Sequence, residues 1–321
     1  MIAKMLLSVS TLAALTITAN AADMPVKAPR VVEQPQQVMG YVELYGGWAR
    51  VKDTPCVGCD TDTANGWVLG GAGRATWWWA PNYSIQLDAQ GEGTSYKFNN
   101  NNGGFNRVSA HSYLIGGHVN WRDPQRGLIG IFGGAGDATN YLTFNTSVRH
   151  GLIGGEAQLY WGPVTLYGQG GYQSTLGSIS SGFLDSMQAW FVRGTARVYV
   201  NANFRLEGTV LYADGDADFN NVPANTLDFT TWLWRAKAEY KFATSPFSIF
   251  AVYESSRTTS DQVFGFGGTQ HTRVTDNRVM GGLRLYLNEN TLQFNDRNGT
   301  TLDIIAPFSA PSFIAPNTNV N

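Results

Sequence analysis

Apolar and polar residues alternate along most of this chain with a period of two. Between residues 83 and 92, Ile85, Leu87 and Ala89 share one face, whereas Gln86 and Asp88 occupy the other. This alternation is typical of a β-strand, in which successive side chains point to opposite faces. It predicts twelve strands, at residues 39–52, 65–79, 83–96, 108–122, 127–138, 147–161, 164–175, 188–200, 204–215, 227–242, 247–258 and 273–287.

The connections between the predicted strands alternate in length. Short turns fall at residues 80–82, 122–126, 162–163, 201–203 and 243–246, and longer polar loops at about 53–64, 97–107, 139–146, 176–187, 216–226 and 259–272. Short turns at one end and long loops at the other are typical of a transmembrane β-barrel. We therefore predict an all-β fold, a transmembrane antiparallel up-and-down barrel of about twelve strands, with short periplasmic turns and longer extracellular loops.

A soluble β-sandwich or a lipocalin-like barrel would show the same alternation. The apolar face of each predicted strand, however, is nearly free of ionisable residues along its centre. Positions 232, 234, 236, 238 and 240, for example, are Trp, Trp, Ala, Ala and Tyr. A lipid-facing Arg or Lys at the bilayer midplane costs about 2–4 kcal/mol, which would explain this exclusion.

Aromatic residues on the apolar face form two rows, and this pattern favours the membrane barrel further. Such rows are expected at the two membrane interfaces of a barrel. The row beside the short turns contains Trp77, Trp79, Tyr83, Trp121, Trp161, Phe204, Tyr240 and Phe247, and the row toward the long loops contains Trp48, Trp67, Trp190, Trp232 and Tyr253.

The composition of the chain agrees with this fold. Only 14% of the 321 residues are charged, against roughly 25% in soluble domains. The 22 Lys and Arg nearly balance the 24 Asp and Glu. A normal apolar content with a small net charge argues against disorder. Without a basic excess to neutralise phosphates, we expect no nucleic-acid partner.

The regions outside the predicted barrel, which spans residues 39–287, have different sequences. Residues 1–21 have the features of a cleaved signal peptide: Lys4, a short apolar stretch and Ala19-Asn20-Ala21. The apolar stretch is too short for a transmembrane helix, which needs about 20 residues. We interpret residues 22–38 as a periplasmic linker and 288–321 as a C-terminal periplasmic tail, with folding back as a plug the equal alternative. We expect the mature protein in the outer membrane.

The chain resembles the porin-like and opacity-type outer-membrane barrels of Gram-negative bacteria. The resemblance is carried by the signal peptide, the mature start at residues 22–29, the strand array and the last strand, 282–287, Gly-Leu-Arg-Leu-Tyr-Leu. That last sequence is similar to the Gly-x-x-Φ-x-Φ signal that such proteins present to the barrel-assembly machinery. The family signal usually ends the chain, whereas 34 residues follow it here. The resemblance implies contact with outer-membrane lipid and lipopolysaccharide, and no cofactor.

Parity places several ionisable side chains on the inward face. Folding each hairpin about its short turn sets unlike charges opposite one another at three places, and directly opposed unlike charges stabilise a sheet by roughly 0.2–1 kcal/mol. A slip of one residue would break all three pairs. We predict that the three wall pairs are Arg74 with Asp88, Arg197 with Glu207, and Arg235 with Glu254.

The remaining inward charges are asymmetric along the chain. The positive ones lie on the predicted strands eight to twelve, and the negative ones mainly on strands one to six. Closure of the barrel would bring Arg284 opposite Glu43. We predict a transverse field across a wet, narrow pore, and hence a passive channel for small hydrophilic or zwitterionic solutes. The expected pore-lining residues are Arg193, Arg205, Lys237, Lys241, Arg278, Arg284, Glu43, Glu92 and Glu156. The alternative is a non-conducting structural or surface-interaction barrel.

An outer-membrane hydrolase is a third possibility. Such an enzyme would need a His held beside a Ser or an acid. His118 and His150 point inward on separate strands, with no obvious nucleophile beside them. We therefore expect no enzymatic activity and no catalytic residues.

Two weaker signals concern metals and disulfides. Cys56 and Cys59 lie in the first long loop, where a loop disulfide is favoured over a metal site. The run from Asp214 to Asp218 starts like a calcium loop but lacks the required Gly and Glu, because Phe219 and Asn225 stand there. We expect no metal.

Overall fold

The computed structural model describes residues 38–54, 61–99, 105–140, 146–177, 184–219, 226–264 and 268–304. The predicted signal peptide, most of the predicted linker, Cys56 and Cys59 lie outside these residues. The elements are β1 (Val38–Thr54), β2 (Asp62–Ala80), β3 (Tyr83–Asn99), β4 (Phe105–Asp123), β5 (Gly127–Asn140), β6 (Thr146–Trp161), β7 (Val164–Thr175), β8 (Leu184–Asn201), β9 (Phe204–Phe219), β10 (Thr226–Lys241), β11 (Phe247–Phe264), β12 (Gly268–Tyr286) and α2 (Leu292–Asn298).

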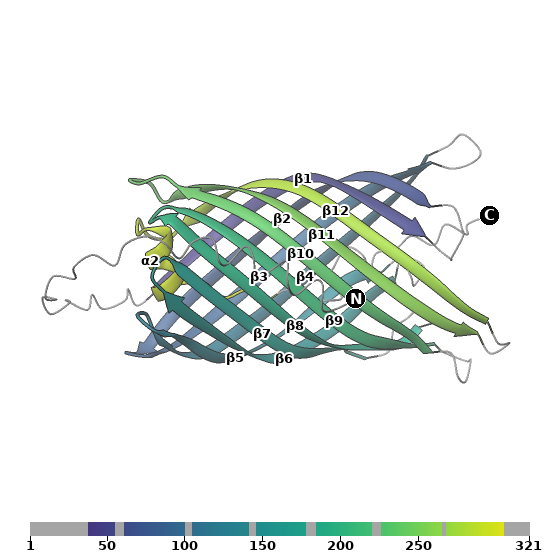
Figure 1. The fold of residues 1–321 in the computed structure, drawn as a ribbon, viewed down its shortest axis with the longest axis horizontal. Coiled ribbons are helices and arrows are strands. Elements are labelled where there is room, and N and C mark those ends of the chain that lie inside the picture. Colours follow the sequence, from purple (N-terminus) through teal and green to yellow (C-terminus); the bar gives the residue numbers. More distant parts are fainter. Residues whose placement is uncertain are drawn as a thin grey trace, which may run out of the picture. The chain divides into compact units, whose positions relative to one another are not determined.

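The predicted fold class is confirmed, because the twelve strands form one closed antiparallel barrel in which β1 pairs with β12 (Figure 1). Several strands continue further than predicted on the long-loop side. β11, for example, was predicted to end at residue 258 and ends at Phe264. The strands continue because neighbouring strands keep pairing there: Asp228 of β10 still lies opposite Asp261 of β11. Closure leaves none of the twelve described strands with an unpaired edge, as a membrane-spanning sheet requires.

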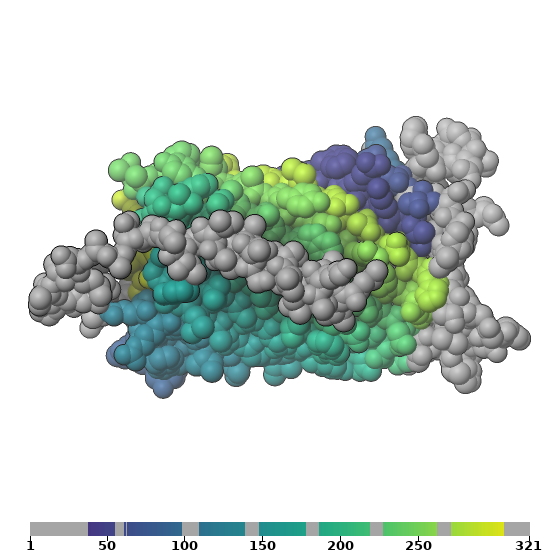
Figure 2. Space-filling model, in the orientation of Figure 1, coloured from purple at the N-terminus to yellow at the C-terminus, as the bar shows by residue number. Residues whose placement is uncertain are grey.

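The outer face of the wall is apolar. Leu44, Ile129 and Ile153 are each more than 60% exposed, and so is Leu159. Aromatic residues of both predicted rows, including Trp79 and Trp161 beside the short turns and Trp67 and Trp190 toward the long loops, are also exposed on this face. Figure 2 shows coloured side chains of neighbouring strands lying against one another on the outer surface. Hydrocarbon is the solvent that suits such a surface.

The segment after β12 turns back to the barrel. Thr291 caps α2, because its hydroxyl accepts a hydrogen bond from the Phe294 amide at 3.2 Å. The helix lies at the short-turn end of the barrel (Figure 1), where Gln293 donates a hydrogen bond to the carbonyl of Gly162 in the turn between β6 and β7. Yellow C-terminal residues are visible at the same end in Figure 2. In the part of the chain that the structure describes, no helix is long and apolar enough to cross a membrane.

Beyond α2, residues 299–304 run into the barrel outside any helix or strand. Leu302 and Ile304 are buried, at 0% and 1% exposure. Leu302 packs with Leu128 and Tyr167, and Ile304 joins an apolar cluster that includes Leu114. The described part of the segment predicted as a periplasmic tail therefore contacts the lumen face of the wall, as in the plug alternative. We call residues 288–304 the C-terminal segment below.

Candidate functional site in the barrel lumen

The three wall pairs predicted from hairpin register are brought together on the lumen face. In each, the two residues are Cα partners on adjacent strands. The separations of the charged atoms are 3.9 Å for Arg74 Nε and Asp88 Oδ2, 2.9 Å for Arg197 Nε and Glu207 Oε2, and 2.7 Å for Arg235 Nε and Glu254 Oε2.

Glu239 of β10 is the centre of the largest charge cluster, which we call the Glu239 cluster. Arg205 and Arg284 donate hydrogen bonds to its carboxylate at 2.6 and 3.0 Å, and Lys237 lies 3.8 Å away. Arg284 continues to Glu43 at 2.5 Å across the closure of the barrel. The cluster therefore gathers five inward residues of β1, β9, β10 and β12. Its positive and negative side chains pair with one another, without a residue of the C-terminal segment.

Glu239 is completed by two neutral donors. Tyr286 Oη donates at 2.9 Å and Ser248 Oγ at 2.8 Å. A buried carboxylate is tolerated only when its lone pairs are satisfied in this way. Sequence reasoning did not select Glu239 as a site residue. Its inward position as an acid between Lys237 and Lys241 was the available signal.

Glu92 of β3 is connected to the basic side of the barrel. Arg278 of β12 forms an ion pair with it, although β1 and β2 lie between the two strands. Tyr45 also donates to Glu92, at 2.9 Å. On its other side, Arg278 contacts Asp276 at 3.2 Å.

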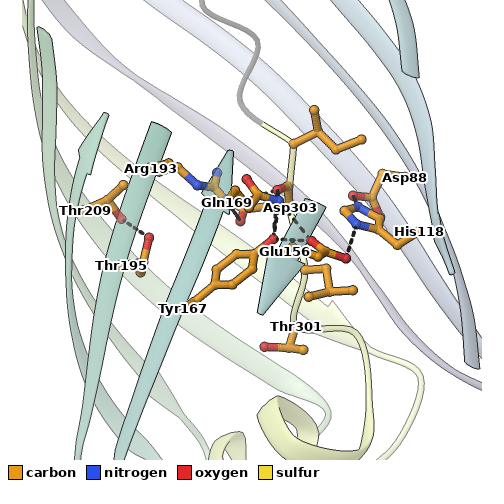
Figure 3. A network of polar contacts seen from close by, with 12 residues as sticks. Asp88, His118, Glu156, Tyr167, Gln169, Arg193, Thr195, Thr209, Thr301 and Asp303 are labelled. Atoms are coloured by element: carbon orange, nitrogen blue, oxygen red, sulfur yellow. Dashed lines mark hydrogen bonds and ion pairs between the residues drawn. The ribbon is translucent and has the colours of Figure 1, made fainter. Parts of the chain in front are cut away.

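Glu156 belongs to a second cluster, on β3 to β8, which we call the His118 cluster (Figure 3). The ring of His118 lies between two carboxylates, with Nδ1 2.9 Å from Glu156 and Nε2 3.1 Å from Asp88. Tyr167 donates to Glu156 at 2.7 Å. Arg193 of β8 lies at the far side of this cluster, above the ring of Tyr167 at 5.0 Å.

The predicted transverse field is not what the structure shows. The acids Glu43 and Glu92 of the early strands are each joined to an arginine of β12, and Glu156 is joined to His118. Glu43 and Arg284 are register partners on the adjacent strands β1 and β12. The length of the arginine side chain lets Arg278 reach Glu92 across β1 and β2. Desolvated charges that stayed apart on opposite walls would each carry an uncompensated penalty.

Lys241 was expected to line the pore and does not. Its Nζ donates to the carbonyls of Ser245 and Glu289, at 2.7 and 3.3 Å, near the short turns. It therefore ties the turn between β10 and β11 to the start of the C-terminal segment.

Two carboxylates of the C-terminal segment are bound by the wall. Asp296 accepts from Arg197 at 2.8 Å, and Asp303 accepts from Arg193 at 2.5 Å. Burial alone would raise the pKa of Asp296, but the neighbouring Arg197 and Arg205 outweigh it and hold this pKa below its usual value. Sequence reasoning missed both aspartates, because the segment has no strand periodicity to give its side chains a direction.

A cavity of about 160 Å³ remains in the lumen beside the C-terminal segment. Its lining includes both signs of charge, such as Glu43, Glu92 and Asp303 against Arg235 and Arg278. Apolar side chains, among them Leu233, Phe250 and Met280, complete it. The cavity is therefore large enough for several water molecules or a small solute, and it offers hydrogen-bond donors and acceptors together.

Within the described ranges, no group of three or more His, Cys, Asp or Glu side chains is arranged to hold a metal ion. Most of the residues that bind one another in the lumen are arginines, tyrosines and carboxylates, joined by His118, Lys237 and Ser248, and they provide hydrogen-bonding and ion-pairing chemistry.

We compared the chain with known proteins. No family model matches the chain, and no curated protein matches it. Among solved structures, it is similar to an outer-membrane channel from Pseudomonas putida F1, with 8% identity, 80% of this chain and 100% of that chain covered, and a TM-score of 0.49. A FadL homologue from Pseudomonas aeruginosa shares 10% identity over 79% of this chain and 91% of its own, with a TM-score of 0.41. OmpT of Vibrio cholerae shares 12% identity over 77% and 99%, with a TM-score of 0.36.

These similarities concern the fold alone. With its apolar outer face, its aromatic residues near both ends and its closed sheet, the described part of the chain is a twelve-strand antiparallel barrel of the transmembrane type.

Proposed function

We propose that this barrel is a narrow passive channel of the outer membrane for small hydrophilic or zwitterionic solutes. The observation that carries the proposal is the lumen cavity, which presents carboxylates such as Glu92 and guanidinium groups such as Arg235 to the same space. A solute that carries both an ammonium and a carboxylate group finds a partner for each there. Such contacts replace part of its hydration shell, which is how a narrow pore selects polar solutes.

The C-terminal segment sets the width of this path. Residues 299–304 occupy part of the lumen, and the cavity lies beside them. We expect a small conductance in the full-length protein and a larger one when the segment is released. The strand count supports a narrow path, because twelve strands fall between the filled eight-strand barrels and the wide sixteen-strand porins.

Planar-bilayer recording with the pure, refolded full-length protein tests the proposal. We expect discrete conductance steps, and swelling of protein-containing liposomes in amino acids and small sugars with a sharp size limit. Heat-inactivated protein in the same lipid is the control. If protein with native β-sheet circular dichroism gave no conductance steps and no swelling, the channel would be disproved.

A non-conducting structural barrel is the second candidate. The observation that favours it is the ion pairing across the lumen, since Arg278 to Glu92 spans β1 and β2 and would brace the wall. The two candidates differ in one result: a structural barrel gives no conductance even after the C-terminal segment has been released.

We also propose that the chain is not an enzyme. Both ring nitrogens of His118 are taken up by carboxylates, which leaves neither nitrogen to activate a serine or threonine. Incubation with ester and peptide substrates, with the same preparation used for conductance, tests this expectation directly.

A further inference from the structure

The backbone of the C-terminal segment is held by side chains of the wall. Six of its carbonyl oxygens, between residues 298 and 304, accept hydrogen bonds from lumen-facing donors on β2, β3, β4, β7 and β8. The bonds are Trp78 to Asn298 at 2.7 Å, Arg122 to Gly299 at 2.5 Å, Arg197 to Thr301 at 3.0 Å, Gln86 to Leu302 at 2.8 Å, Gln169 and Arg193 to Asp303 at 3.0 and 2.9 Å, and Gln90 to Ile304 at 3.1 Å.

The side chain of Gln86 binds both backbone groups of Leu302, as the backbone of a neighbouring strand does in a sheet. Its side-chain amide donates to the Leu302 carbonyl and its oxygen accepts from the Leu302 amide, at 2.8 and 3.3 Å. Every peptide carries these same backbone groups. The donors therefore form a track that recognises an extended backbone, whatever its side chains.

Side-chain selectivity is added at three consecutive residues. Leu302 packs with Leu128 and Tyr167, and Asp303 pairs with Arg193. Ile304 lies against glycine: a Cβ added at Gly116 would come within 2.4 Å of its Cδ1. The wall therefore contacts an aliphatic, an acidic and an aliphatic side chain in order.

We propose that the lumen is a binding site for extended peptides of this aliphatic–acidic–aliphatic pattern, and that residues 298–304 are its tethered occupant. The proposal rests on the channel function and names a ligand class for the same lumen. A free peptide of this kind competes with the segment for the same donors. The peptide has two possible sources, the periplasm and the outside of the cell, and both would be recognised by the same chemistry.

A cleavable tether tests the proposal while keeping the full chain for folding. A site for a specific protease is inserted next to Glu289, which is exposed between β12 and α2, and is cut after refolding. A fluorescent peptide with the sequence of residues 292–304 is then added, and its anisotropy is followed. We expect saturable binding of the peptide to the cut barrel. Its affinity for the uncut barrel should be lower by about 10-fold or more, because the tethered segment competes there.

Peptide variants and barrel variants test the recognition. A peptide with Asp303→Asn should bind about 10-fold more weakly, because a charged hydrogen bond to Arg193 is lost. An unrelated extended peptide that keeps Leu-Asp-Ile should compete, and one with the order Asp-Leu-Ile should compete more weakly, because its backbone still meets the donors but its carboxylate no longer meets Arg193. In the barrel, Arg193→Gln should weaken binding to a similar extent. Arg126→Gln, in an exposed turn between β4 and β5, is the matched control and should leave binding unchanged.

Conductance recorded on the same samples separates the two proposals. Conduction by the cut barrel without peptide binding overturns the peptide site and leaves the channel. Peptide binding without conduction leaves the peptide site and overturns the channel. If the peptide binds equally well to cut and uncut barrels, or if scrambling its sequence has no effect, it binds elsewhere and the peptide site is overturned. Adding the peptide to one side of the bilayer at a time and measuring block identifies the side from which it enters.

Discussion

The two charge clusters of the lumen differ in one respect: whether the C-terminal segment is needed to complete them. In the Glu239 cluster, Arg205 and Arg284 are both paired with carboxylates of the wall. In the His118 cluster, the carboxylate that pairs with Arg193 is Asp303 of the C-terminal segment. The first cluster therefore belongs to the wall, whereas the second includes a receptor for the segment. The residues that close the barrel are therefore different from those that hold the C-terminal segment.

Removing the charge of Glu239 should have the largest effect on stability. Glu239→Gln leaves Arg205 and Arg284 buried without their shared carboxylate, and breaking a buried ion pair by removing one partner costs about 3–5 kcal/mol. Unfolding in denaturant with tryptophan fluorescence as the readout measures this loss. Asp261→Asn, at an exposed position near the end of β11, is the control. A loss no larger than that of the control would mean that the cluster does not hold the wall.

Removing the charge of Asp303 should affect the C-terminal segment and spare the wall. Asp303→Asn weakens the charged hydrogen bond to Arg193, which is worth about 1.5–3 kcal/mol. Amide hydrogen exchange at Leu302 should accelerate by about 10- to 100-fold, because local opening of the segment becomes easier. Amides in the centre of β10 should be unchanged, and they serve as the internal reference. Equal acceleration at both places would merge the two clusters into one cooperative unit.

The anchor at Asp296 gives the segment a pH dependence. The pKa of Asp296 is held below its usual value by Arg197 and Arg205, in spite of burial. A group whose folded pKa is lowered contributes stability above its unfolded pKa, and that contribution is lost as the pH falls through the folded pKa. Docking of α2 should therefore be complete at neutral pH and weaken on acidification.

The protection of the α2 amides from hydrogen exchange, measured at a series of pH values from neutral to acidic, reports this dependence. Asp296→Asn should weaken docking at neutral pH and remove most of its change on acidification. A variant that keeps the full acid response would assign the response to another group, and the Asp296 anchor would then carry no pH sensitivity.

The same contrast explains how much could be predicted from the sequence. The strands and the pair of Arg74 and Asp88 follow from local alternation and from short turns, which fix the register of each hairpin. The bond from Arg278 to Glu92 does not, because parity gives the direction of a side chain and not its reach across two strands. The position of Asp303 could not be predicted either. The turn back into the barrel depends on hydrogen bonds to several distant strands, and these bonds leave no periodic pattern in the sequence.

The smallest effect is expected at the wall pair of Arg235 and Glu254, which belongs to neither cluster. Cross-strand charge pairs contribute roughly 0.2–1 kcal/mol, and Arg235 keeps 25% of its side chain exposed, so water can replace the lost carboxylate. Glu254→Gln should therefore lower the free energy of unfolding by no more than about 1 kcal/mol and leave Leu302 exchange unchanged. A loss as large as that of Glu239→Gln would place Arg235 among the fully desolvated charges, and the cavity beside it would then hold too little water to pass a hydrated solute.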